Sequence, residues 1–298
     1  MIYVADDDAM VTAINLHTGA WLWEFKADDD IKLPLVVVND MVIVSDDGGE
    51  IYALNNATGA KIWNSDTDKG PEYPIAANEQ VVVIVDQDKK VFGYNLKTGK
   101  TQWELNFEEE IKQTAAIFDG IFFLSDGKKR LLAREVLTAR TMWIYDDEDD
   151  IVSSVAIEND KLYFHDNDEQ IVALDRATGH LQWKFEPKDG SLHTDLLVAN
   201  NVVYFETHGP TALNALDATT KQILWTLPLM EDLRYGPVAA AGLIYLVDKE
   251  DNIFVVDSES GKTLSKYKLS ETPTSAPNVA NGTLFIGAEN KTLYAFEQ

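Results

Sequence analysis

The chain has 298 residues, a hydrophobic share of 45% and no cysteine. It can therefore build a packed core, and disulfides and thiol chemistry are excluded. Its 50 acidic and 25 basic side chains give a net charge of −25, which repels phosphate backbones and anionic lipid, so we expect no nucleic-acid partner. No apolar run reaches the ~18 residues that span a bilayer, so we expect no membrane-spanning helix.

Short strands separated by turn residues run from the first residues onward. Residues 2–5 already form a predicted strand, and the next unit contains predicted strands at 33–38, 41–45, 50–54 and 61–64. The joints contain Asn39-Asp40, the run 46–49 and the run 56–59, all rich in turn-forming residues. Alternating patterns without a helical window of ~11 residues indicate an all-β fold.

Tryptophan reveals an internal repeat. Six Trp residues are spaced 40 residues apart, or 42 in the last interval: Trp23, Trp63, Trp103, Trp143, Trp183 and Trp225. Each Trp is the last residue of a sequence motif that begins with Ala-Leu-Asp/Asn and continues with Thr-Gly. Residues 53–63 are the clearest copy of this motif. Each Trp is predicted to be buried between neighbouring units as a docking side chain, covering on the order of 200 Å².

The motif also predicts the structure of the turn that follows each third strand. An Asp or Asn at the end of a third strand can accept hydrogen bonds from the following turn, and Gly can take a backbone angle that a Cβ obstructs. Two units depart from this pattern: Glu135 occupies the Asp/Asn position and Ala139 the Gly position of one unit, and Lys221 occupies the Gly position of another.

Four-stranded units at a period of about 40 residues predict the blades of a β-propeller. Eight segments match third strands: 11–15, 51–55, 91–95, 131–135, 171–175, 213–217, 253–257 and 292–296. We therefore expect an all-β, eight-bladed β-propeller of four-stranded antiparallel blades. The first blade is expected to lack its innermost strand and the last blade its outermost. We interpret residues 1–298 as a single propeller domain that lacks native N-terminal residues closing the ring.

The repeat Ala-x-Asp/Asn-x-x-Thr-Gly-x-x-x-Trp resembles that of the pyrroloquinoline-quinone (PQQ) propeller family over the whole chain. That family includes quinoprotein dehydrogenases and the BamB assembly lipoproteins, and the organisation here is most similar to the latter. The quinoproteins usually carry adjacent cysteines beside the quinone and bind calcium through Glu, Asn and Asp. This chain has no cysteine, and none of its residues can be matched to those ligands, which favours a member without catalysis.

Most acidic residues fall in the turns at one end of the strands, chiefly 6–8, 28–30, 108–110 and 146–150. They can be solvated surface that keeps the protein soluble. Alternatively, they form a docking surface for a basic protein partner, and we take Asp146, Asp147, Asp149 and Asp150 as its candidate contacts. Calcium is a third possibility because oxygen ligands abound; the nearest approach to a calcium loop is Asp66, Asp68 and Glu72, without the spacing of an EF-hand.

Two segments at the start of innermost strands place an apolar side chain beside polar ones. They are residues 191–193 and 232–235, and they contain the candidate partner contacts Leu192, His193, Leu233, Arg234 and Tyr235. These residues either anchor a partner or close the entrance of the channel.

Three histidines map to the same end of neighbouring blades: His165, His193 and His208, with Asp166, Asp168 and Glu206 nearby. Histidine combined with carboxylate suits zinc or another first-row metal. The alternative is that they are ordinary polar loop residues.

We therefore expect a non-catalytic, monomeric scaffold that binds protein partners and has no catalytic residues and no cofactor, unless it binds calcium. Its native form is expected outside the cytoplasm, in the periplasm or at the outer membrane, with a lipid anchor. The alternatives are a sensor or ligand-binding propeller of a larger protein, a degenerate PQQ-dependent quinoprotein, and a cytoplasmic location.

Overall fold

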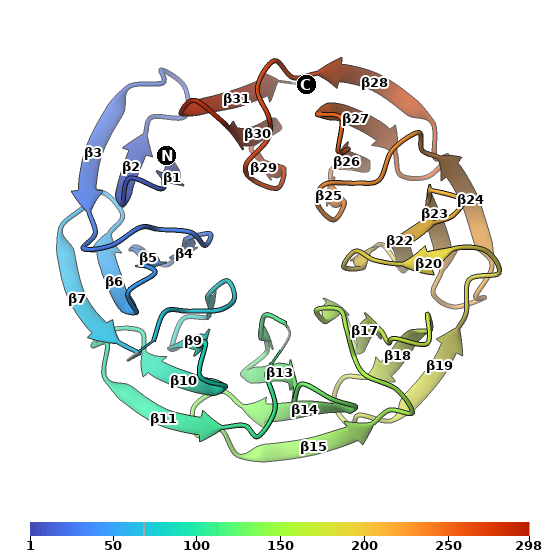
Figure 1. The fold of residues 1–298 in the computed structure, drawn as a ribbon, viewed down its shortest axis with the longest axis horizontal. Coiled ribbons are helices and arrows are strands. Elements are labelled where there is room, and N and C mark those ends of the chain that lie inside the picture. The colour runs from blue at the N-terminus through green and yellow to red at the C-terminus, as the bar shows by residue number, and fades with distance from the viewer. Residues whose placement is uncertain (68, 112, 298) are drawn as a thin grey trace. The chain divides into compact units, whose positions relative to one another are not determined.

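The computed structural model describes residues 1–67, 69–111 and 113–297 and divides into two compact units, 1–151 and 152–298. Over the described residues the regular structure is entirely β, in eight antiparallel sheets, four to each unit (Figure 1). Each sheet is one blade of the predicted repeat. The sheets confirm the expected fold class, an all-β, eight-bladed β-propeller.

Unit 1 contains blades 1 to 4. Their strands are β1 (Ile2–Ala5), β2 (Met10–Ile14) and β3 (Trp21–Lys26) in blade 1; β4 (Val36–Val38), β5 (Met41–Ser45), β6 (Glu50–Asn55) and β7 (Lys61–Asp66) in blade 2; β8 (Ala76–Ala77), β9 (Val81–Val85), β10 (Lys90–Asn95) and β11 (Thr101–Asn106) in blade 3; and β12 (Ala116–Phe118), β13 (Ile121–Ser125), β14 (Arg130–Glu135) and β15 (Thr141–Asp146) in blade 4.

Unit 2 contains blades 5 to 8. Their strands are β16 (Ala156–Glu158), β17 (Lys161–His165), β18 (Ile171–Asp175) and β19 (Leu181–Phe185) in blade 5; β20 (Ser191–Leu192), β21 (Leu197–Ala199), β22 (Val202–His208), β23 (Ala212–Asp217) and β24 (Ile223–Pro228) in blade 6; β25 (Val238–Ala240), β26 (Leu243–Val247), β27 (Asn252–Asp257) and β28 (Thr263–Lys268) in blade 7; and β29 (Asn278–Ala280), β30 (Thr283–Ala288) and β31 (Thr292–Glu297) in blade 8.

The predicted third strands all exist, with ends that differ by one residue at most. The predicted strand 33–38 is shorter in the structure, where β4 covers only Val36–Val38. Pro34 lies just ahead of it, and a proline has no N–H for a ladder. Blade 6 differs from the others because β20 and β21 both pair with β22.

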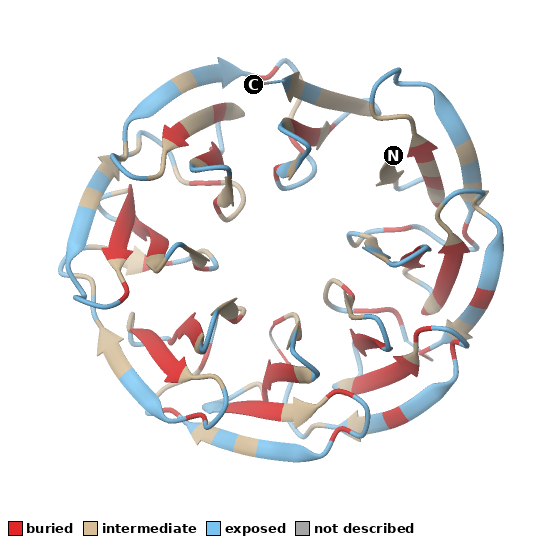
Figure 2. Ribbon diagram, turned by 180° about the vertical axis from the view of Figure 1, so that it is seen from behind, coloured by how far each residue is buried: buried red, intermediate tan, exposed pale blue. Residues whose placement is uncertain are grey.

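The cores lie between successive blades of each unit. Every residue of the middle strands β5 and β9 is buried. Figure 2 shows that buried residues concentrate on the middle strands, whereas many residues of the fourth strands are exposed. A typical cluster joins Ile43 of blade 2 to Ile84 and Tyr94 of blade 3. Sheets covered on both faces need nearly continuous apolar runs, which explains sequences such as Val81–Val85.

Four of the repeated Trp side chains connect their blade to the next blade of the same unit. In these, the indole N–H donates to a backbone carbonyl 33 residues further on, over 2.8–3.1 Å: Trp23 to Asn56, Trp63 to Leu96, Trp103 to Val136 and Trp225 to Ser258. Only Trp63 and Trp103 are buried, with 8% and 9% exposed. The other four are half-buried, so the expectation that all six are buried was wrong. They lie on fourth strands, where one side of the ring can remain open to solvent.

The turn after each third strand follows the predicted chemistry. Asn55 Oδ1, for example, accepts hydrogen bonds from the backbone N–H and the hydroxyl of Thr58, at 3.0 and 2.9 Å. Gly59 has φ +71°. Ala139 and Lys221 take the same left-handed region, with φ of 55° and 58°, so the turn geometry is kept where the glycine is not.

Candidate functional site

The hairpin between the second and third strands of most blades begins with a structural aspartate. Its Oδ1 accepts the backbone N–H four residues further on, over 2.8–3.2 Å, in Asp6, Asp46, Asp86, Asp126, Asp166 and Asp248. The sequence analysis did not assign this capping role to them, although the 40-residue spacing of the first five is visible in the sequence. Part of the acidic surplus at this end of the blades therefore serves the fold.

The remaining acids at the hairpin end of unit 1 are partly neutralised by lysines. Lys32 Nζ lies 2.5 Å from Asp47 Oδ2, and Lys128 Nζ lies 2.7 Å from Glu109 Oε1. The Lys128 ammonium lowers the pKa of the exposed Glu109 carboxyl. Exposed pairs such as these contribute little to stability because solvent screens them, so they organise the acidic loops more than they hold the fold.

The acidic loop at 146–150 has two kinds of carboxylate. Asp146 is exposed, and Asp149 and Asp150 are half-buried. Asp147 is only 7% exposed, and its Oδ1 accepts the backbone N–H of Glu148 at 2.7 Å. Asp147 was expected to contact a partner, and the structure corrects this, because its carboxylate is used within the loop.

The structure describes two of the three residues nearest to a calcium loop. Asp66 ends β7, Glu72 lines a small hollow beside the 46–47 turn, and Asp68 lies outside the described residues. Over residues 1–67, 69–111 and 113–297, the one group of three His, Asp or Glu ligands close enough to share a metal ion is Glu206, His208 and Asp232.

The two apolar anchor candidates belong to the cores of unit 2. Leu192 is 5% exposed and Leu233 is 3% exposed, and each packs in a cluster between neighbouring blades. The expectation that they could anchor a partner is therefore wrong for this conformation. Arg234 pairs with Asp251 at 2.7 Å, and the Tyr235 hydroxyl donates to the Pro273 carbonyl at 3.1 Å, so both also hold neighbouring loops.

The three candidate histidines separate into a pair and a single residue. His165 is buried at the end of β17, where desolvation lowers its pKa, and its backbone N–H donates to Ser153 Oγ at 2.8 Å. His193 and His208 come together, with ring centroids 4.4 Å apart. The imidazole of His193 also lies 2.8 Å from Ser191 Oγ through Nε2.

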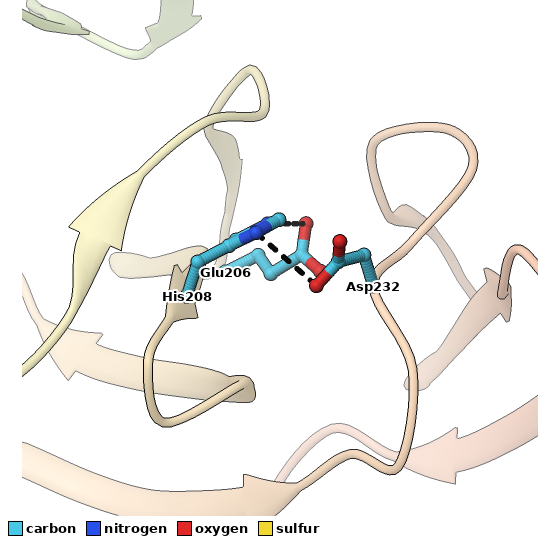
Figure 3. A group of neighbouring side chains, drawn as sticks. All are labelled: Glu206, His208 and Asp232. Atoms are coloured by element: carbon cyan, nitrogen blue, oxygen red, sulfur yellow. Dashed lines mark ion pairs between the residues drawn. The ribbon is translucent and has the colours of Figure 1, made fainter.

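The Glu206–His208–Asp232 cluster lies at the hairpin end of blades 6 and 7. Figure 3 shows the His208 ring facing both carboxylates, with an ion pair drawn to each. His208 Nε2 is 3.4 Å from Glu206 Oε2 and His208 Nδ1 is 3.1 Å from Asp232 Oδ1. Glu206 and His208 come from β22, whereas Asp232 lies on the loop before β25, so adjacency of the three depends on how the two blades pack.

The two carboxyls of this cluster have opposite electrostatic environments. Burial raises the pKa of Glu206, although the Leu233 N–H and His208 act in the other direction. Lys249, 3.0 Å from Asp232 Oδ2, lowers the pKa of the Asp232 carboxyl. A cluster with displaced pKa values at an irregular place in a repeat is a candidate functional site.

Comparisons with known proteins agree with this fold. The model of a family described as outer membrane protein assembly factor BamB matches residues 1–185, 153–228 and 209–298. No curated protein matches the chain in sequence. Over the described residues, no helix is long and apolar enough to cross a membrane.

Three solved structures share the fold at low sequence identity. BamB from Moraxella catarrhalis is 17% identical with a TM-score of 0.82, over 99% of this chain and 91% of that one. The computationally designed Ika8 protein is 14% identical with a TM-score of 0.86, over 99% and 92%. A europium-containing methanol dehydrogenase is 15% identical with a TM-score of 0.76, over 98% and 80%. At these identities the similarity concerns the fold alone.

Proposed function

The chain belongs to the outer membrane protein assembly factor BamB family, and on this basis we propose that it is a non-catalytic scaffold that binds protein partners. The observation that carries the proposal is the family match, which extends over the whole chain. The family's description also supports an extracytoplasmic location at the outer membrane. A rigid propeller suits such a role because its blades fix many loops in one orientation.

The acidic loops of unit 1 are the surface that we propose for a basic protein partner. Asp146 presents an exposed carboxylate at the end of β15, and Asp149 and Asp150 follow it. Their backbone is held, since the Asp147 N–H donates to the Lys129 carbonyl at 2.7 Å. Clustered charges on an ordered loop accelerate the encounter with an oppositely charged partner.

The test compares two triple variants with equal charge. Asp146, Asp149 and Asp150 are changed to Asn, and Asp147 is kept because it is structural. The control changes three acids in the turns at the opposite end of the blades: Asp40→Asn, Glu79→Gln and Asp119→Asn. Both proteins and the wild type are immobilised and exposed to envelope extract of the native host. Each captured protein is identified and purified, and its association rate is then measured at several salt concentrations.

We expect the association rate to fall steeply with salt, because screening shortens to about 8 Å near 0.15 M. The loop variant should associate at least severalfold more slowly, while the control behaves like the wild type. If every recovered partner binds all three proteins equally at every salt concentration, the acidic loops are only solvated surface. If no envelope protein binds at all, the scaffold proposal itself fails.

The proposed lack of catalysis has its own test, because the methanol dehydrogenase shares the fold. We expect that mixing the protein with PQQ and calcium gives no stoichiometric change in visible absorbance and no dye-linked oxidation of methanol or aldose sugars. A stoichiometric complex, or dye reduction above that of PQQ alone, would refute a purely scaffolding role.

A further inference from the structure

Blade 6 departs from the repeat at its hairpin. The spacing from Trp183 to Trp225 is 42 residues, against 40 elsewhere, and β22 extends to His208. Ser45, Val85, Ser125 and Val247 pair with the third strand at the position that Glu206 occupies in blade 6. Blade 5 has His165 at this position. The carboxylate of blade 6 differs from the small or apolar residues of the other four blades, and such departures from a repeat concentrate at functional sites.

Glu206 is buried, and one of its carboxylate oxygens makes no hydrogen bond to the described residues. Its side chain is 0% exposed, and Oε1 accepts the Leu233 N–H at 2.7 Å. Oε2 accepts no hydrogen bond from the described residues, and its neighbour at 3.4 Å, His208 Nε2, also makes none. A buried carboxylate oxygen without a donor is costly unless a cation satisfies it.

The ligand atoms have the chemistry and spacing of a transition-metal site. Glu206, His208 and Asp232 each offer one atom within 4.8 Å of the others. Tetrahedral ligands about 2.0–2.1 Å from zinc lie about 3.4 Å apart, and His208 Nε2 lies 3.4 Å from Glu206 Oε2. Asp232 Oδ1 is 3.1 Å from the other ring nitrogen, Nδ1, so one metal ion would use only one of the two nitrogens and displace the other contact. The nitrogen donor favours a first-row metal over calcium or magnesium, which prefer oxygen alone.

We propose that Glu206, His208 and Asp232 bind a divalent transition-metal ion of the zinc type. Water would complete the coordination, because His193 packs against His208 but does not belong to the group of ligand atoms within 4.8 Å of one another. Bound metal would link β22 of blade 6 to the loop before β25 of blade 7. The competing account is metal-free, with His208 paired directly to both carboxylates.

The test uses the full chain, stripped with chelator and dialysed. Zinc alone is titrated calorimetrically near neutral pH, and Co²⁺ is titrated in parallel by visible absorbance. The variants are His208→Gln and Asp232→Asn, and the matched control is His180→Gln, an exposed histidine in a turn of the same unit. Asp232→Asn keeps the test valid if His208→Gln fails to fold, because the Asp232 side chain is 31% exposed.

We expect one zinc ion per chain and visible Co²⁺ bands of a low-coordinate nitrogen–oxygen site. Each cluster variant should weaken zinc binding at least tenfold, while His180→Gln leaves it unchanged. Zinc should also raise the melting temperature of the wild type but not that of the cluster variants. The metal-free account is correct if zinc does not bind in one-to-one ratio, or if its affinity is the same in the wild type and both cluster variants.

Discussion

The indole N–H of Trp23 in blade 1 donates a 2.9 Å hydrogen bond to the backbone carbonyl of Asn56 in blade 2. The bond fixes the ring over the turn that follows β6. A Cβ built on Gly59, in that same turn, would lie 2.6 Å from the Trp23 ring. The Thr-Gly turn of one blade therefore packs against the Trp side chain of the blade before it. This contact explains why the turn and the Trp recur at the same spacing.

Gly59→Ala should destabilise unit 1 more than the same change at Gly19. Both glycines have a left-handed backbone, with φ of +71° and +67°, and an alanine there costs about 1–2 kcal/mol. At Gly59 the new methyl also overlaps the Trp23 ring, which adds ~1–3 kcal/mol. At Gly19 the new methyl would have no neighbouring atom within 4 Å. Urea denaturation of the two variants measures the difference.

If both variants lose the same free energy of unfolding, backbone strain alone explains the glycine in this turn. A Trp23→Phe background provides a further control. The smaller ring should reduce the extra cost of Gly59→Ala while leaving the cost of Gly19→Ala unchanged, as expected for coupling between contacting residues.

Lys221→Gly should stabilise unit 2. Lys221 is exposed and has φ 58° where other blades have glycine. The substitution removes left-handed strain of about 1–2 kcal/mol, but glycine adds backbone entropy to the unfolded chain. The free energy of unfolding should therefore rise by roughly 0.5–1 kcal/mol. Lys97→Gly removes the same charge from the equivalent turn of blade 3 without a positive φ and should destabilise. A loss of stability in Lys221→Gly, measured by urea denaturation, contradicts the prediction.

Local patterns were enough to predict the blades and the turns. The Trp spacing and the position of Asn55 depend on contacts that repeat at fixed sequence separation, so a single sequence displays them in blade after blade. The hairpin aspartates such as Asp86 repeat equally well, but their acidic character made them resemble surface charge. Their role was missed because a carboxylate that caps a hairpin and one that is solvated look alike in sequence.

The candidate site could be predicted only in part. His193, His208 and Glu206 were noted as a group because they map to one end of neighbouring blades. Asp232 was assigned to a partner-binding segment, since its approach to His208 depends on packing between two blades. Leu192 and Leu233 were misjudged for the same reason: an apolar residue beside polar ones can face a partner or a core, and only the neighbouring blade decides.

Asp175→Asn should lose its effect on stability at low pH. Asp175 Oδ1 accepts the N–H and the hydroxyl of Thr178 at 2.8 and 2.6 Å, and these bonds lower its pKa. A lowered folded pKa stabilises above the unfolded value of about 3.9, and this contribution disappears as the pH falls through the folded pKa. Asn55 makes the same bonds without charge, so the variant should fold normally.

We expect the urea midpoint of Asp175→Asn to lie slightly below that of the wild type at pH 7, because hydrogen bonds to a charged acceptor are stronger. The gap should begin to close as the pH falls below about 5 and should disappear once the pH has fallen through the lowered folded pKa of Asp175, where the wild type has lost its carboxylate. A gap that stays constant over this range would show that the charge of Asp175 is not linked to folding.

Asp86→Asn should have the opposite dependence on pH. Asp86 Oδ1 accepts two backbone N–H groups, whereas Oδ2 is buried without a hydrogen bond. Burial raises its pKa, so the native state binds its proton more readily than the unfolded chain does. The wild type therefore loses stability as the pH rises from about 4 through the folded pKa. The amide keeps the accepting oxygen and removes the buried charge, so the urea midpoint should rise at pH 7.

The matched control is Asp126→Asn at the same position of the next blade. Arg130 Nε donates to Asp126 Oδ2 at 2.5 Å, so this carboxylate has the cation that Asp86 Oδ2 lacks, and its replacement leaves the guanidinium without its charged acceptor. Asp126→Asn should therefore lower the urea midpoint at pH 7 while Asp86→Asn raises it, and the gain in Asp86→Asn should shrink toward pH 4. If both variants shift the urea midpoint in the same direction, then whether Oδ2 has a hydrogen-bond partner does not determine how a hairpin aspartate affects stability.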